Sequence, residues 1–343
     1  HAENVDSHVL HIYILVAPDL LGAPSVFPLV PTHTDVVKRA LRMKRFCHEW
    51  GSLLGGRTTH PTKPVPGGMA SMPTKKELLT LKQRMLDEFV PDALETLETV
   101  KALAGAIPAF ERPTEYMAVH TDEEYGLYEG NVQTVMPDGT KEVYDVHDYL
   151  GITNEYVVPQ STAKYTNNKM GSYMAGALAR VNNHFDQLHP EAQKIGAALG
   201  LDKLCFNPYM NSVAQLVECF HSTFETLELI DELVAMDDYD PDQELVKPTK
   251  FGWGSACVEV PRGILFHAYE YDQDGMCVKC DCIIPTNQNH ANIQLDFEKL
   301  VPELIAAGKT EAEMELALEM LVRAYDPCIS CSTHMLKVEF VNR

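Results

Sequence analysis

Near its C-terminus the chain reads DPCISCSTH over residues 326–334, directly after a helical pattern. Pro327 ends that helix, because proline has no amide hydrogen with which to continue it. Cys328 and Cys331 then lie three residues apart on a turn, where both sulfur atoms can reach one metal ion at about 2.3 Å. Taken alone, the two thiols are compatible with a structural zinc site, a redox-active dithiol or no function.

A second group of cysteines could supply the other half of a zinc site. Cys277, Cys280 and Cys282 follow an Asp-Gly pair at residues 274–275. Side chains alternate between the two faces of a strand, so Cys280 and Cys282 share one face and Cys277 points the other way. We interpret all three as small buried residues of a β-hairpin.

Composition and charge exclude several classes of protein. The chain has 343 residues, with 28 Lys and Arg against 49 Asp and Glu, a net charge of −21 that would repel nucleic acid and anionic lipid. No segment offers the roughly 20 apolar residues of a membrane span, and no secretory signal is present. The nine cysteines lack the density of a disulfide scaffold. The sequence therefore predicts a soluble, cytoplasmic protein.

Helical periodicity dominates the rest of the chain. Thr74 and Thr310 each open a capping box with a Glu three residues later. Apolar spacing predicts helices over residues 35–54, 74–100, 162–188, 210–236 and 311–325, and Pro91 is a candidate kink in the second.

Two stretches differ from this helical pattern and predict β-hairpins. They cover residues of about 116–146 and 264–284, with turns at Pro-Asp-Gly 137–139 and Asp-Gly 274–275. We expect a mainly α fold of the α+β class, a long-helix bundle with appended β-hairpins.

The DPCxxCxxH pattern resembles the closing signature of the [NiFe] hydrogenase large subunit. Other segments resemble that family in the same order along the chain: SHVLHIY at 7–13, GRTTHP at 56–61, GALAR at 176–180, EVPRG at 259–263 and PTNQN at 285–289. The similarity spans essentially the whole chain. It implies one hydrogenase large-subunit domain over residues 1–343.

The resemblance assigns metal ligands. It implies that Cys328 is a terminal nickel ligand and that Cys331 bridges nickel to iron in a Ni-Fe(CN)2(CO) centre. His334 resembles the ligand of a nearby magnesium or iron ion. Soft thiolates suit nickel and iron, whereas imidazole suits a second, harder site.

Further residues are expected around that centre. Arg262 resembles the arginine that lies over the two metals and supports their reaction, with Pro261 and Thr286 completing a pocket for the cyanide and Asp326 beside it. A guanidinium near an anionic group donates charge-assisted hydrogen bonds.

Three polar residues are weaker candidates. Arg57, His60 and His267 are expected either to support the metal ligands or to be structural polar residues. His8 and His11 are expected in the core rather than on a metal.

The chain departs from the family pattern at both ends. The family's N-terminal Cys-x-x-Cys pair and its Arg-Gly-x-Glu segment are absent, so we expect an N-terminally incomplete chain that is inactive without that pair and its partners. Residues 335–343 follow His334, where the family's maturation protease cuts. This tail is either precursor sequence or retained.

The implied function is that of the catalytic subunit: reversible oxidation of H2, with electrons passed to an iron–sulfur small subunit. The motifs look most like the cytoplasmic NAD(P)-linked, sulfhydrogenase-like group. No dinucleotide fingerprint is present, so NAD(P), flavin and iron–sulfur clusters would lie in partner subunits, including a nicotinamide-reducing or other electron-transfer module. The alternatives are a metal-free or zinc-bearing structural subunit of an electron-transfer complex, and a thiol oxidoreductase using Cys328 and Cys331.

Overall fold

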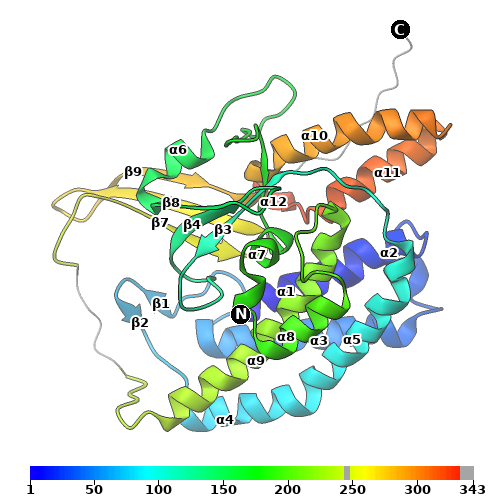
Figure 1. Ribbon diagram of the computed structural model, residues 1–343. Helices are drawn as coiled ribbons and strands as arrows, with labels where there is room; N and C mark the ends of the chain where they lie inside the picture. The colour runs from blue at the N-terminus through cyan, green and yellow to red at the C-terminus, as the bar shows by residue number, and fades with distance from the viewer. Residues whose placement is uncertain (243–247, 333–343) are drawn as a thin grey trace. The chain divides into compact units, whose positions relative to one another are not determined.

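The computed structural model describes residues 1–242 and 248–332 (Figure 1). The chain divides into two compact units. Unit 1 comprises His1–Ala106, His189–Ile195 and Leu216–Gly252, and unit 2 comprises Ile107–Leu188, Gly196–Gln215 and the chain from Trp253 onward. That residues 1–343 form a single hydrogenase large-subunit domain stays a prediction.

Unit 1 is helical. Helix α1 packs on α3, and the buried side chains of Val5 and Val9 belong to its apolar face. The elements are α1 (Ala2–Leu10), α2 (Ala17–Leu20), α3 (Thr34–Gly55), the short hairpin β1 (Pro64–Val65) and β2 (Gly68–Met69), α4 (Lys75–Arg84), α5 (Val90–Leu103), and the greater part of α8 (Pro190–Ala198) and α9 (Asn211–Ala235). None of the helices in the described ranges is long and apolar enough to cross a membrane.

The predicted helix over residues 74–100 is present as two helices. Thr74 forms the expected capping box with Glu77 at the start of α4. A π-helical turn, Met85–Phe89, joins α4 to α5, and Pro91 lies in the first turn of α5. Proline cannot donate to a carbonyl of the preceding turn, and the π-helical turn directly before Pro91 is where the regular α-helical hydrogen-bond ladder is interrupted.

Unit 2 contains two sheets that share one core. The first has the order β5–β4–β3–β6, formed by β3 (Glu115–His120), β4 (Asn131–Val135), β5 (Lys141–Tyr144) and β6 (Tyr173–Met174), which runs parallel to β3. The second is the antiparallel sheet of β7 (Trp253–Val260), β8 (Gly263–Tyr271) and β9 (Cys277–Ile283). Val119 and Val132 of the first sheet and Phe266 and Ile283 of the second belong to one buried cluster. Both predicted hairpins are confirmed, and β7 was not predicted.

Among the helices of unit 2, one was predicted correctly and another only in part. Helices α10 and α11 lie side by side in Figure 1, and Thr310 caps α11 as predicted. The predicted helix over residues 162–188 is wrong before Ala177, because Gly176 takes a φ of 122° and residues 173–174 pair with β3. The elements are α6 (Tyr149–Thr153), α7 (Ala177–His184), α10 (Pro285–Ala306), α11 (Glu311–Ala324) and α12 (Ile329–Ser332).

Candidate metal centre

The two C-terminal cysteines of the described chain lie together on one turn after α11. Their Cα atoms are 5.3 Å apart and the pair is joined as a disulfide. The amide of Cys331 donates to the carbonyl oxygen of Cys328 at 3.2 Å, which closes the turn. The thiolate is the form that binds a metal, so this pair must be reduced before it can act as two ligands.

Helix α10 holds this turn through Thr286. Thr286 is buried in the first turn of α10, and its Oγ1 accepts a hydrogen bond from the amide of Cys328 at 3.0 Å. The sequence singled out Thr286 for the pocket, and the structure places it in direct contact with the first cysteine. The hydroxyl therefore fixes the backbone from which the Cys328 sulfur projects.

Arg262 reaches the same turn from the second sheet. Pro261 and Arg262 form the two-residue turn between β7 and β8, and Arg262 Nη2 lies 3.1 Å from Asp326 Oδ1. Asp326 is fully buried, and its Oδ2 accepts a hydrogen bond from Gln215 Nε2 at 2.8 Å. This contact lacks hydrogen-bond geometry, which leaves Asp326 Oδ1 buried without a hydrogen-bond partner within the described residues. Arg262 Nε, which is not part of the contact, is also buried and has no such partner there.

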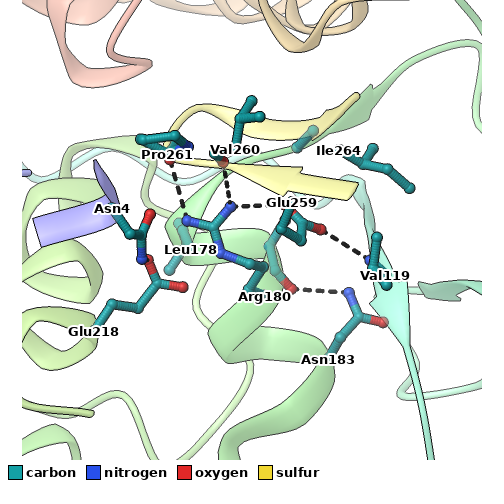
Figure 2. A network of polar contacts seen from close by, with 12 residues as sticks. Asn4, Val119, Leu178, Arg180, Asn183, Glu218, Glu259, Val260, Pro261 and Ile264 are labelled. Atoms are coloured by element: carbon teal, nitrogen blue, oxygen red, sulfur yellow. Dashed lines mark hydrogen bonds and ion pairs between the residues drawn. The ribbon is translucent and has the colours of Figure 1, made fainter. Parts of the chain in front are cut away.

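A buried ion pair fixes the strand that leads into the Arg262 turn. Arg180 Nη1 lies 2.7 Å from Glu259 Oε2, and both side chains are 1% exposed. Figure 2 shows the same guanidinium donating to the carbonyl oxygens of Val260 and Pro261, at 3.0 and 3.1 Å. Glu259 in turn accepts a hydrogen bond from the amide of Val119 on β3. Arg180 thus fixes the backbone directly before Arg262.

Two glycines allow the turn to pack closely against the segment before α7. Gly263 has a φ of 132°, and a Cβ there would lie 2.7 Å from the Cβ of Ala175 and 2.9 Å from the amide nitrogen of Gly176. Gly176 has a φ of 122°, and a Cβ there would lie 3.3 Å from the carbonyl oxygen of Arg262. Side chains at either position would push the Arg262 turn away from this segment.

Amide side chains of α10 tie the helix to both sheets. Asn289 bonds both the amide and the carbonyl oxygen of Ala175, at 2.8 and 3.1 Å, as a neighbouring strand would. Gln288 Nε2 donates to the carbonyl oxygens of Ile264 and Ile283. Asn292 donates to the hydroxyl of Tyr325, directly before Asp326. The polar side chains of α10 therefore anchor the helix on both sheets and hold the residue before Asp326.

Other predicted residues lie elsewhere. Arg57 and His60 are exposed in a loop of unit 1, where Arg57 Nε donates to the carbonyl oxygen of His60. His267 lies on β8 and contacts Cys282, with its Nδ1 3.3 Å from that sulfur. Any support that these three give to the metal ligands stays a prediction. His334 and the tail lie outside the described residues.

The expectation that the cysteines of β9 are buried is wrong. Cys277, Cys280 and Cys282 are all exposed. The buried face of this sheet is taken by the side chains that alternate with them, including Ile283 and, on β8, Phe266. In the described chain no group of three or more His, Cys, Asp or Glu side chains is arranged to hold a metal ion, and this includes the β9 cysteines.

The residues around the C-terminal turn suit a soft metal that carries anionic ligands. Two adjacent sulfurs provide soft donors, and thiolates bind soft and borderline metals, nickel, iron and zinc among them. The buried Arg262 Nε is an unused N–H of a cation, and such groups are nearly always satisfied in native structures. An anionic ligand on the metal would satisfy it.

Sequence reasoning missed the residues that position this site. Arg180 and Glu259 stood in motifs without an assigned role, although two opposite charges inside otherwise small or apolar segments are a signal for a buried pair. Gln215 had a weaker signal, a polar residue within the apolar run of α9. Its contact with Asp326 depends on the tertiary structure.

Comparisons with known proteins agree in family. The family model described as nickel-dependent hydrogenase matches residues 113–334. Sulfhydrogenase 1 subunit alpha of Pyrococcus furiosus is 32% identical over 337 residues, covering 98% of this chain and 76% of that protein. The NAD-reducing hydrogenase HoxS subunit beta of Cupriavidus necator is 26% identical, covering 98% of this chain and 74% of that protein.

A solved structure agrees as well. A crystal structure of an NAD+-reducing [NiFe]-hydrogenase in the H2-reduced state matches with a TM-score of 0.85 and 26% identity, over 97% of this chain and 78% of that chain.

Proposed function

Because the chain belongs to the nickel-dependent hydrogenase family, we propose that Cys328 and Cys331 supply two of the thiolate ligands of its nickel–iron centre. Its activity is that of an oxidoreductase acting on H2, which it converts to protons and electrons. One observation carries the assignment of the site: Arg262, Thr286 and Asp326, which lie far apart in the sequence, meet at the turn that bears the two sulfurs.

The centre would supply heterolytic cleavage of H2 once bound. The details implied by the family pattern, two cyanides and one carbon monoxide on iron and a magnesium or iron ion at His334, belong to this proposal. In this proposal the two sulfurs are part of a larger ligand set.

The role of Arg262 follows from its chemistry and surroundings. A guanidinium stays protonated throughout the working pH range, so it acts as a donor rather than as a base. Its positive charge is balanced by the buried carboxylate of Asp326, which Gln215 holds in place. The unused Nε–H is then available to an anionic ligand of the metal, and a preorganised donor of this kind needs no reorganisation during the reaction.

Asp326 and Thr286 are positioning residues. Asp326 has a φ of 51°, a left-handed conformation that redirects the chain after α11. Thr286 then holds the amide of Cys328. Together they set the direction in which the sulfurs project, which matters because ligand placement must be accurate to a fraction of an ångström.

The partners come from the relatives. Their names describe an alpha subunit of a sulfhydrogenase and a beta subunit of an NAD-reducing hydrogenase, so each is one subunit of an assembly. We extend this to an iron–sulfur small subunit that receives the electrons and a nicotinamide-reducing or other electron-transfer module, in the cytoplasm. Iron–sulfur clusters, flavin and NAD(P) would be bound by those partners.

Infrared spectroscopy of the purified hydrogenase complex tests the site. Cyanide and carbon monoxide on iron absorb in a region free of protein bands, and nickel is measured on the same sample by elemental analysis. We expect both signals, with H2-dependent dye reduction. A complex that contains zinc or no metal, and shows no such bands, would establish the structural-subunit alternative instead.

The disulfide itself favours a second candidate, a redox dithiol at Cys328 and Cys331. That function requires two titratable thiols in the purified, reduced complex and no nickel. A redox dithiol does not account for the burial of Asp326 or for its contact with Arg262. Thiol counting beside the nickel measurement separates the two candidates.

A further inference from the structure

A cluster of three reactive side chains lies on the second sheet and is not used by the proposed hydrogenase reaction. His267 on β8 is the register partner of Cys282 on β9, and Tyr269 is the partner of Cys280. Residues 267, 269, 280 and 282 share one face, because partners and alternate residues point the same way. The opposite face carries Phe266 and Ile283 into the core, so the exposed cluster stands on a rigid base.

The contacts converge on one sulfur. His267 Nδ1 lies 3.3 Å from Cys282 Sγ, and the hydroxyl of Tyr269 lies 2.8 Å from Nδ1 and 3.8 Å from Sγ. Burial of the hydroxyl and its contact with Cys282 raise the pKa of Tyr269 to about 12, so it remains a hydrogen-bond donor at neutral pH. An imidazole can take the thiol proton, and both groups can then donate to the thiolate.

The neighbouring thiols have different surroundings. Cys277 Sγ donates to the carbonyl oxygen of Lys279 on its own strand, at 3.4 Å. Cys280 lies opposite Tyr269 in the ladder rather than opposite an imidazole. All three thiols are exposed, so access to solvent does not distinguish them. Only Cys282 combines exposure with an imidazole at hydrogen-bond distance in the described part of β9.

We infer that Cys282 is a reactive thiol that forms mixed disulfides with low-molecular-weight disulfides, activated by His267 and Tyr269. The Cys282 thiolate attacks one sulfur of the incoming disulfide, forming a new S–S bond as the old one breaks. The Cys282 sulfur is oxidised, and the departing sulfur leaves as a thiolate that takes up a proton. The thiolate is the nucleophile in such exchange, and the His267 imidazole lies at hydrogen-bond distance from Sγ, where it can accept the thiol proton.

The mixed disulfide should persist on Cys282. Cys280 is two residues away on the same strand, a separation of about 6.6 Å between Cα atoms. That distance is at the upper limit for a disulfide, so Cys280 is poorly placed to displace the bound thiol. The modified state is therefore expected as one added thiol group on residue 282.

The test uses the purified, reduced hydrogenase complex and oxidised glutathione at pH 7, followed by quenching, digestion and mass spectrometry. Cleavage after Lys279 separates Cys277 from the other two, and fragment ions separate Cys280 from Cys282. We expect Cys282 to react at least about ten times faster than Cys277 and Cys280. Equal rates for the three thiols, or faster reaction at Cys280, would overturn the inference.

Variants separate activation from mere exposure. His267→Gln should slow the reaction at Cys282 by about tenfold while the rates at Cys277 and Cys280 change less than about twofold. Tyr269→Phe keeps the ring and should give a smaller decrease at Cys282 alone. If His267→Gln leaves the Cys282 rate unchanged, the imidazole does not activate it. The readout is modification, so it is independent of the metal content and of the proposed function.

Discussion

Arg262 Nη2 lies 3.1 Å from Asp326 Oδ1, and this ion pair joins the β7–β8 turn to the turn that carries the two C-terminal sulfurs. Asp326 is fully buried, whereas the Arg262 side chain is 24% exposed. The charge of the carboxylate is thus balanced inside the protein, and the guanidinium keeps an unused Nε–H.

Replacing Arg262 by Lys should lower H2-dependent dye reduction by roughly 100-fold or more while nickel content is kept. Lysine preserves the charge but loses the planar fork, so it cannot pair with Asp326 and donate through Nε at once. Arg45→Lys is the matched control, because Arg45 is exposed and pairs with Glu49 four residues on. Unchanged turnover in Arg262→Lys would refute the role.

Asp326→Asn should keep the fold and lower activity. Asparagine has the same shape and tolerates the φ of 51°, so the turn after α11 is preserved while the negative charge beside Arg262 is lost. Asp326→Val removes the charge and also strains the backbone, by about 1–2 kcal/mol. Thermal unfolding and activity are measured on both. Full activity in Asp326→Asn would show that the charge is dispensable.

Breaking the Arg180–Glu259 pair should destabilise the protein by about 3–5 kcal/mol, because one buried charge is left unpaired. Arg180→Met and Glu259→Leu are each expected to show this cost in urea titrations. The double variant removes both charges and should be less destabilised than the sum of the two single variants. Additive costs would mean that the two side chains act independently.

Serine at either C-terminal cysteine should abolish nickel binding, because a hydroxyl is a poor ligand for nickel compared with a thiolate. Cys328→Ser and Cys331→Ser are compared by elemental analysis of the purified complex. Cys280→Ser, an exposed thiol on β9, is the control and should retain nickel. Stoichiometric nickel in Cys331→Ser would remove that residue from the ligand set.

His184 should make stability fall in acid. Burial and, to a smaller extent, the neighbouring His120 lower the pKa of His184 to about 3. Between about pH 6.5, where the unfolded imidazole titrates, and pH 3, the unfolded state binds more protons. The free energy of unfolding therefore falls as pH drops through this window, by at most about 1.4 kcal/mol per pH unit.

The measurement compares the pH dependence of urea unfolding in the natural protein and in His184→Phe. Phenylalanine keeps a ring to stack on His120, whose ring centroid lies 5.2 Å from that of His184, but it cannot be protonated. The slope between pH 6.5 and pH 4 should be shallower in the variant. Identical slopes would show that other groups, such as the buried His221 with its pKa lowered to about 4, account for the acid sensitivity.

Some elements could be predicted because their causes are local. The capping boxes at Thr74 and Thr310 form between residues three apart, and the turn at residues 137–139 joins β4 to β5 as expected. The helix predicted over residues 162–176 is absent, and its apolar spacing gave no sign of this. The backbone there is set by the pairing of β6 with β3 and by the hydrogen bonds of Asn289, and both partners are distant in sequence.

The site shows the same division. The motif pattern led to the prediction of Arg262, Thr286 and the two cysteines as site residues, since those residue types in that order carry the family resemblance. The tertiary structure alone decided that Asp326 would be buried against Gln215, that Arg180 would hold the strand before Arg262, and that the β9 cysteines would face solvent beside His267. The reason is physical: helix caps and turns depend on neighbours within a few residues, whereas burial and ion pairing depend on which distant segments pack together.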